Sequence, residues 1–159
     1  MTRLNRILAL ALTLVLMLGA VAGVVGSAEE GSANPIVAVN VAYEDKIAPM
    51  FAIDRTGVAE ASTDISVTFD GVEAVYVGSM ADLKGKPVAI FKSQGVVAKR
   101  LGDNLDVVIV IDGETTVVSY NVVNNYFRVM LNSATATAAQ KALYQATIDY
   151  AAAAKAHFG

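Results

Sequence analysis

Residues 65–77 read Ile-Ser-Val-Thr-Phe-Asp-Gly-Val-Glu-Ala-Val-Tyr-Val, and this stretch decides the fold. Apolar and polar residues alternate up to Phe69, which is the pattern of a strand with one buried face. Asp70-Gly71 interrupts the alternation, and Val72–Val77 then resumes an apolar run. An Asp-Gly pair between two such runs favours a two-residue turn, because both positions of a type I′ turn need positive φ. We therefore predict a β-hairpin here.

The same signal returns later in the chain. Leu105–Ile111 is rich in β-branched residues, Asp112-Gly113 follows it, and Glu114–Ser119 continues as a partner strand. This pattern predicts a second hairpin of the same kind. A third hairpin is predicted from Pro87–Lys92 and Val96–Leu101, on either side of Gln94-Gly95.

Two further strands precede these hairpins. Residues 37–43 alternate larger and smaller side chains with period two, and Ile47–Asp54 is predicted as the next strand. Pro49 cannot donate a hydrogen bond to a neighbouring strand, so we place it near the start of its strand or on a sheet edge. Residues 55–63 are predicted to form a connection.

The last fifth of the chain changes to a helical period. Asn121 is predicted to cap a helix of about ten residues, whose apolar stripe comprises Val122, Val123, Tyr126, Phe127, Met130 and Leu131. Thr137 and Gln140 match a capping box, which predicts a second helix that ends near His157. Its packed face is expected to carry Ala139, Leu143, Ala146, Tyr150, Ala153 and Ala154. The connection is short, so the two helices are expected to be antiparallel.

Together these elements predict a single α+β domain over residues 36–159. About seven or eight strands should form an antiparallel β-sandwich or curled sheet, covered by a C-terminal hairpin of two helices. The chain contains no cysteine. Its core is therefore expected to hold by packing alone, without a disulfide framework.

The first 28 residues are predicted to be a signal peptide. Arg3 and Arg6 precede an apolar run over residues 7–25, and Gly26-Ser27-Ala28 places small residues before a cleavage site after Ala28. Cleavage after Ala33 is an alternative, and so is retention of the apolar run as a membrane anchor, because its length is near that of a bilayer span. Residues 29–35 are predicted as a linker. The protein is thus expected to be secreted, with association at the cell surface as an alternative.

Charge limits the classes of partner. Without Arg3 and Arg6, the predicted mature chain has fewer basic than acidic residues. A net negative domain is a poor nucleic-acid binder. It also lacks the surface charge that attracts proteins to anionic lipid, so membrane contact is expected only through an uncleaved leader. The expected partner is a protein or a glycan.

The C-terminal part of the chain resembles a known module. The segments that carry the resemblance are Val97-Ala-Lys-Arg-Leu101 with Asp103, Tyr120-Asn-Val122 with Tyr126, and the helix from Tyr150 to Phe158. They are similar to the Ala-Ala-Lys-x-Met, Tyr-Ser-Val-x-x-Tyr and Tyr-Gly-Ala-Ala-Ala-Gln-x-Tyr-Phe segments of a C-terminal module in secreted and surface proteins of anaerobic gut Firmicutes. Asn121, Ala151 and His157 depart from that pattern. The resemblance implies a secreted β-rich module with C-terminal helices, often appended to larger surface proteins, and no catalytic residues.

Candidate catalytic and metal-binding residues have simpler interpretations. His157 is the only histidine and lies near the chain end, so we expect a solvated side chain at a helix terminus. Asp103-Asn104-Leu105-Asp106 has too few oxygens for a calcium loop and is predicted to be a turn. Acidic residues that could pair as catalytic carboxylates are expected to serve solubility instead: Glu44, Asp45, Asp54, Glu60, Asp64, Asp70 and Glu73. The sequence thus predicts no catalytic, cofactor-binding or metal-binding residue, and the aromatic residues are expected mainly in the core.

A basic stretch is the remaining candidate site. It comprises Lys84, Lys86, Lys92, Lys99 and Arg100, with no acidic residue from 83 to 102. These cations are expected to pair with acidic residues across the sheet or to protect an edge strand. The alternative is a face for an acidic glycan, teichoic acid or acidic protein. We predict a non-catalytic binding or structural module, with an extracellular glycan-binding module or an unrecognised hydrolase as alternatives.

Overall fold

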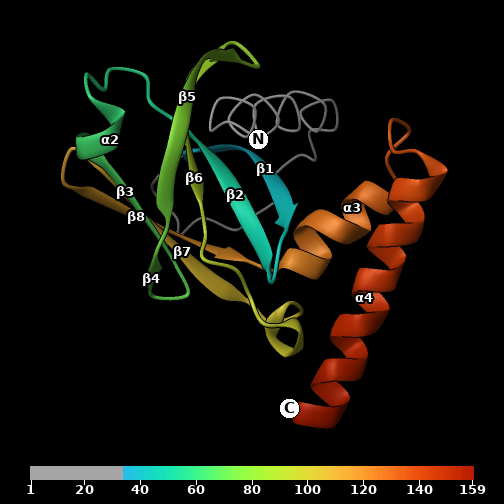
Figure 1. Cartoon of the computed structure of the whole chain (residues 1–159). Coiled ribbons are helices and arrows are strands. Elements are labelled where there is room, and N and C mark those ends of the chain that lie inside the picture. Colours follow the sequence, from blue (N-terminus) through green and yellow to red (C-terminus); the bar gives the residue numbers. More distant parts are fainter. Residues whose placement is uncertain (1–33) are drawn as a thin grey trace, which may run out of the picture.

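Eight strands form two four-stranded antiparallel sheets in the computed structural model, which describes residues 34–159 (Figure 1). The first sheet has the order β1 (Ile36–Tyr43), β2 (Ile47–Asp54), β6 (Lys86–Lys92) and β5 (Val75–Leu83). The second has the order β4 (Val72–Glu73), β3 (Ile65–Phe69), β7 (Leu105–Ile111) and β8 (Glu114–Tyr120). Each sheet joins two hairpins through its central pair, β2 with β6 and β3 with β7. The predicted α+β class and the antiparallel sandwich are confirmed.

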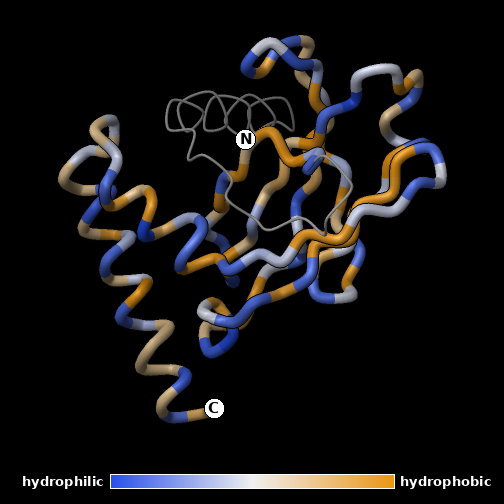
Figure 2. The backbone as a smooth tube through the Cα atoms, turned by 180° about the vertical axis from the view of Figure 1, so that it is seen from behind, coloured by the Kyte–Doolittle hydropathy of each residue, from blue (hydrophilic) through white to orange (hydrophobic). Residues whose placement is uncertain are grey.

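The two sheets share one hydrophobic core. Buried residues of β1, β2 and β6 in the first sheet and of β3, β7 and β8 in the second belong to the same buried cluster. Phe51 of β2 is fully buried, with its ring centroid 5.4 Å from Phe69 and 5.6 Å from Tyr120 of the opposite sheet. Figure 2 shows hydrophobic residues along the strands and hydrophilic residues at many of the turns. Packing of these side chains therefore holds the two sheets together.

Both Asp-Gly turns are confirmed. Asp70 and Gly71 have φ values of 54° and 76°, and Asp112 and Gly113 have values of 49° and 84°. The first hairpin is shorter than predicted, because β4 contains only two residues and pairs with Thr68 and Phe69 alone. The chain then crosses at Ala74 to the other sheet, where β5 begins.

The predicted third hairpin is wrong in its second strand. Val96 makes one isolated bridge with Ile47, and Ala98–Arg100 forms a short 3₁₀ helix, η1. β6 instead forms its hairpin with β5, through a turn at Lys84 and Gly85 with φ values of 55° and 78°. The Lys-Gly pair supplies the positive φ of a hairpin turn, but it is a weaker signal in sequence than Asn-Gly or Asp-Gly.

The C-terminal helices are present, with one unexpected turn. A π-helical turn, η2 (Val123–Phe127), leads into α3 (Arg128–Leu131), and α4 follows (Ala138–Phe158). Asn121 Oδ1 accepts the Asn124 N–H at 2.9 Å, as its predicted capping role requires. The capping box of α4 is also confirmed, with both of its hydrogen bonds present. A further short helix, α2 (Ala61–Asp64), lies in the connection before β3.

The predicted packed face of α4 is wrong for five of its six residues. Ala139, Leu143, Ala146, Tyr150 and Ala153 are exposed, and the buried residues are Tyr144, Thr147, Ala151 and Ala154. α4 packs mainly on η1, η2 and α3, beside the sandwich (Figure 1). Figure 1 also shows α3 and α4 crossing at an oblique angle, where an antiparallel pair was expected. Tyr144 determines which face of α4 is buried, because its ring contacts the rings of Tyr126 and Phe127.

The predicted signal peptide, its two alternative cleavage sites and the linker up to Ala33 lie outside the described residues. Within residues 34–159, no helix is long and apolar enough to cross a membrane.

Candidate functional site

A small pocket opens at the end of the sandwich where β3, β4, the segment after β6 and η1 meet. Its volume is about 180 Å3. The apolar lining is formed by Phe69, Val72, Val96 and Val97. Polar groups of the lining are supplied by Asp70, Ser93, Gln94 and Arg100. Apolar walls with a few polar groups are typical of a small binding site.

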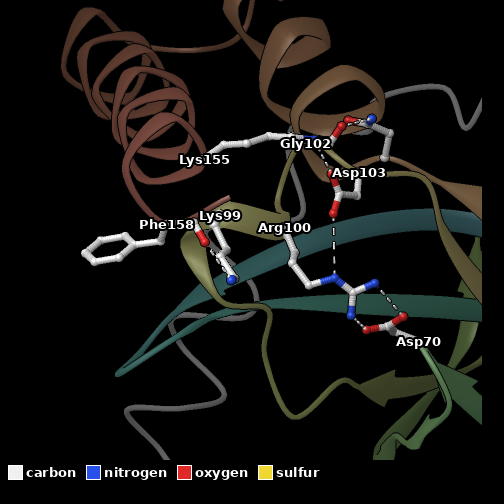
Figure 3. A network of polar contacts seen from close by, with 8 residues as sticks. Asp70, Lys99, Arg100, Gly102, Asp103, Lys155 and Phe158 are labelled. Atoms are coloured by element: carbon white, nitrogen blue, oxygen red, sulfur yellow. Dashed lines mark hydrogen bonds and ion pairs between the residues drawn. The ribbon is translucent and has the colours of Figure 1, made fainter.

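Arg100 ties this end of the molecule together (Figure 3). Its guanidinium holds both carboxylate oxygens of Asp70, with Nη2 at 3.0 Å from Oδ1 and Nη1 donating to Oδ2. Nε lies 3.6 Å from Oδ2 of Asp103. Hydrogen bonding to Asp70, followed by the charges of both carboxylates, raises the pKa of Arg100. Arg100 therefore remains a cation and fixes the β3–β4 turn against η1.

The same network reaches α4. Lys155 Nζ donates to Asp103 Oδ1 at 2.6 Å, and Lys99 Nζ donates to the carbonyl oxygen of Phe158 at 2.9 Å (Figure 3). The hydrogen bond from Lys155, with the nearby charge of Arg100, lowers the pKa of Asp103. The C-terminal turn of α4 is thus held to the segment that borders the pocket.

Buried contacts fix the backbone below this network. Leu101 is fully buried, and its carbonyl oxygen accepts the Val123 N–H at 3.1 Å. Asn121 Nδ2 donates to the Gly102 carbonyl at 2.7 Å and to Asn104 Oδ1 at 3.2 Å. Residues 101–104 are therefore positioned by the start of η2, and this position sets where Arg100 points.

The basic stretch does not gather on one face. Lys86 Nζ lies 2.5 Å from Asp54 Oδ2, and Lys92 Nζ lies 2.7 Å from Glu44 Oε1. Lys86 and Lys92 occupy opposite ends of β6, roughly 20 Å apart at the rise of an extended strand. Lys99 and Arg100 lie together in η1.

Lys84 differs from these four cations. It is exposed at the β5–β6 turn and forms no ion pair with any residue of the 34–159 region. Within the basic stretch, Lys86, Lys92 and Arg100 thus pair with carboxylates and Lys99 donates to a carbonyl oxygen, whereas Lys84 has no ion-pair partner among the described residues.

The other candidate residues have structural surroundings. His157 is exposed in the last turn of α4, with its ring edge-on to Phe158 at 4.5 Å. In the predicted turn at 103–106, Asp103 is held by two cations, and Leu105 begins β7 as a buried residue. No group of three or more His, Asp or Glu side chains within residues 34–159 is arranged to hold a metal ion.

Four aromatic rings pack where β1, η2 and α4 meet: Tyr43, Tyr126, Phe127 and Tyr144. Tyr126 donates its hydroxyl to Asn40 Oδ1 at 2.9 Å, and the Tyr43 hydroxyl lies 3.2 Å from Thr147 Oγ1. Burial raises the pKa of Tyr126 and of Tyr120 far above the usual tyrosine value. Both phenols therefore stay protonated near neutral pH, and the four rings of the cluster pack against one another.

Sequence reasoning missed an exposed apolar band. The band consists of Val72, Val75, Tyr76 and Val77, whose exposed fractions range from 37% to 53%. We expected these residues to form the second strand of a hairpin with one face buried. β5 instead lies at the edge of the first sheet. The edge strand on the same side of the second sheet is β4, which has only two residues. The sequence carries a sign of this exposure, because three consecutive apolar residues at 75–77 cannot all point to one face.

No protein family, curated protein or solved structure matches this chain. We therefore infer the chemistry of the site from its own residues alone. The Ser93 hydroxyl accepts the Gly95 N–H at 3.3 Å, and within the described region no imidazole or carboxylate is hydrogen-bonded to it. A serine without a base is not an activated nucleophile. What the pocket offers is apolar contact, an amide from Gln94 and the edge of a guanidinium that is paired with Asp70.

Proposed function

We propose that this protein is an exported, non-catalytic binding module that holds a segment of a protein partner at the pocket. The observation that carries this proposal is the exposure of Val72 and Val97, which flank the pocket with 48% and 47% of their surface in solvent. The resemblance to C-terminal modules of secreted and surface proteins supports an extracellular setting.

The energetics favour an apolar anchor. Complete burial of a valine contributes about 1.5 kcal/mol or more, so covering two half-exposed valines contributes on the order of 1–2 kcal/mol. Binding energy at interfaces concentrates in a few buried anchors surrounded by polar groups. Gln94 is exposed at the rim, and its Nε2 donates to the Glu73 carbonyl at 3.1 Å, which holds this rim to β4.

A display library of random peptides tests the binding site. The purified protein should enrich peptides with a common apolar position, and Val97→Asp or Val72→Asp should abolish that enrichment. Val129→Asp is the matched control, since Val129 is an exposed valine on α3 and not part of the pocket. Enrichment that persists in both pocket variants would contradict the proposed site, and so would the absence of any enrichment with the wild-type protein.

Export is tested separately by the mass of the protein recovered from a Gram-positive host that expresses the full chain. Protein in the medium should begin at Glu29, or at Asn34 if the second site is cut. A product that retains Met1 in the membrane fraction would instead show an anchor. The basic stretch gives weaker support to a glycan-binding face, because most of its cations already hold carboxylates.

A further inference from the structure

β5 is an edge strand whose first seven residues carry few of the features that usually prevent pairing. It is last in the order of its sheet, and no described strand pairs with its outer edge. Residues 75–81 contain no charged residue and no proline, although edge strands commonly carry these to prevent pairing with other chains. Val75, Tyr76 and Val77 are exposed together on it. Two bulges bend the strand, but Gly78, Ser79 and Met80 between them keep regular pairing with β6.

Opposite charges mark the two ends of this strand. Glu73 precedes β5, Lys84 follows it, and both are exposed. Neither forms an ion pair within the described part of the chain. An extended segment of this length separates them by on the order of 30 Å, so they cannot pair within one molecule. The only charge between them, Asp82, is occupied by the Gly85 N–H at 2.7 Å.

A segment with a negative start and a positive end is complementary to itself when two copies run antiparallel. We propose that β5 pairs with β5 of a second copy of this chain, about a two-fold axis at Ser79, so that Ser79 of each copy lies opposite Ser79 of the other. This register places Gly78 opposite Met80 of the second copy, in the regular part of the strand. It also brings Glu73 of each copy toward the turn that carries Lys84 of the other.

Such a dimer pairs the edge of β5 that has no neighbouring strand in the single chain. The first sheets of the two copies join into one continuous sheet, and the free N–H and C=O groups of both edges gain partners. A two-fold interface forms every contact twice, so two ion pairs close the ends of the paired strands. The dimer does not depend on whether the pocket binds a peptide, because β5 pairs through its backbone edge and the pocket is lined by other segments.

Charge reversal in the full-length protein tests the register. Sedimentation equilibrium should show a reversible dimer for the wild type. Glu73→Lys brings two lysines together at each end of the interface, and Lys84→Glu brings two glutamates together. Each single reversal should raise the dimer dissociation constant roughly tenfold at low salt. The double variant Glu73→Lys/Lys84→Glu exchanges the charges and should return the dissociation constant to near the wild-type value.

Two reversals elsewhere are matched controls. Asp45→Lys and Lys141→Glu make the same changes in net charge away from β5, and they should leave dimerisation unchanged. Thermal unfolding by circular dichroism checks that each variant folds, which is expected because Glu73 and Lys84 are exposed. A monomeric wild type at all concentrations would overturn the proposal. Single reversals without effect, or a folded double variant that fails to recover, would overturn it equally.

Discussion

Tyr120 and Tyr126 are both buried, but their hydroxyl groups meet different surroundings. Tyr126 donates to Asn40 at 2.9 Å, whereas the Tyr120 hydroxyl oxygen has no hydrogen-bond partner among the described residues. Burying an unpaired hydroxyl costs free energy, and a paired one contributes about 1 kcal/mol. The two residues therefore offer a direct comparison of the same group with and without its partner.

We expect Tyr126→Phe to lower the free energy of unfolding by about 1 kcal/mol, because it removes a made hydrogen bond. Tyr120→Phe should leave the free energy of unfolding unchanged or raise it, since it removes a buried group that has no partner. Urea denaturation of both variants provides the measurement. A marked destabilisation by Tyr120→Phe would show that its hydroxyl is hydrogen-bonded after all.

The lowered pKa of Asp103 predicts how the free energy of unfolding depends on pH. Its hydrogen bond from Lys155 and the charge of Arg100 lower its pKa in the folded state, below the unfolded value of about 3.9. Its contribution is therefore present above the unfolded pKa and is lost as the pH falls through the folded pKa. Asp103→Asn should lower the free energy of unfolding by about 1 kcal/mol near pH 7.

The difference between Asp103→Asn and the wild type should shrink as the pH is lowered from 7 to about 2, because the carboxyl becomes protonated first in the unfolded and then in the folded chain. Urea titrations at both pH values measure it. Asp45→Asn, in the exposed β1–β2 turn, is the control and should have little effect at either pH. An equal loss for Asp103→Asn at both pH values would mean that packing, rather than charge, accounts for its effect.

At the level of elements, α4 gives the sharpest correction. Leu143 was expected on the packed face, but 46% of its surface is exposed, whereas the neighbouring Tyr144 is 3% exposed. Leu143→Ala should change the free energy of unfolding by less than about 0.5 kcal/mol. Tyr144→Ala should lower it by about 3 kcal/mol, because it opens a cavity against Tyr126 and Phe127. Thermal or urea unfolding of the pair checks the orientation of the helix.

The elements that could be predicted are those with a strong local signal. Asp70-Gly71 and Asp112-Gly113 give their turns without help from distant residues, and Thr137 with Gln140 gives the start of α4. The face of α4 could not be chosen locally. Alanines lie all around this helix, so the rings of Tyr126 and Phe127, on another helical segment, decide which side is buried.

The candidate site was harder to predict from the sequence than the fold. Charges can be counted from the sequence, but their partners cannot. Asp54 and Lys86 are 32 positions apart and meet because β2 pairs with β6. The exposed band spans two sheets, because β4 ends at Glu73 in the second sheet and β5 begins at Val75 in the first.

At the scale of the whole molecule, Phe51 joins the two sheets. Its ring contacts Phe69 and Tyr120, which belong to β3 and β8. Phe51→Ala should lower the free energy of unfolding by about 3–5 kcal/mol. Both sheets should still unfold in one transition, because they share one core. Circular dichroism in urea measures this loss, and Phe158→Ala, which alters a ring that is 65% exposed, is the control. Separate transitions for the two sheets would contradict a shared core.

The order of strands along the chain has one more consequence. The first sheet takes β1, β2, β5 and β6, and the second takes β3, β4, β7 and β8. A protease that cuts after Lys84, at the exposed tip between β5 and β6, would leave one fragment with β1 to β5 and another with β6 to α4. Each fragment supplies strands to both sheets, so the fragments can separate only if both sheets unfold. The clipped protein should therefore migrate as one species in a native gel and come apart only in denaturant.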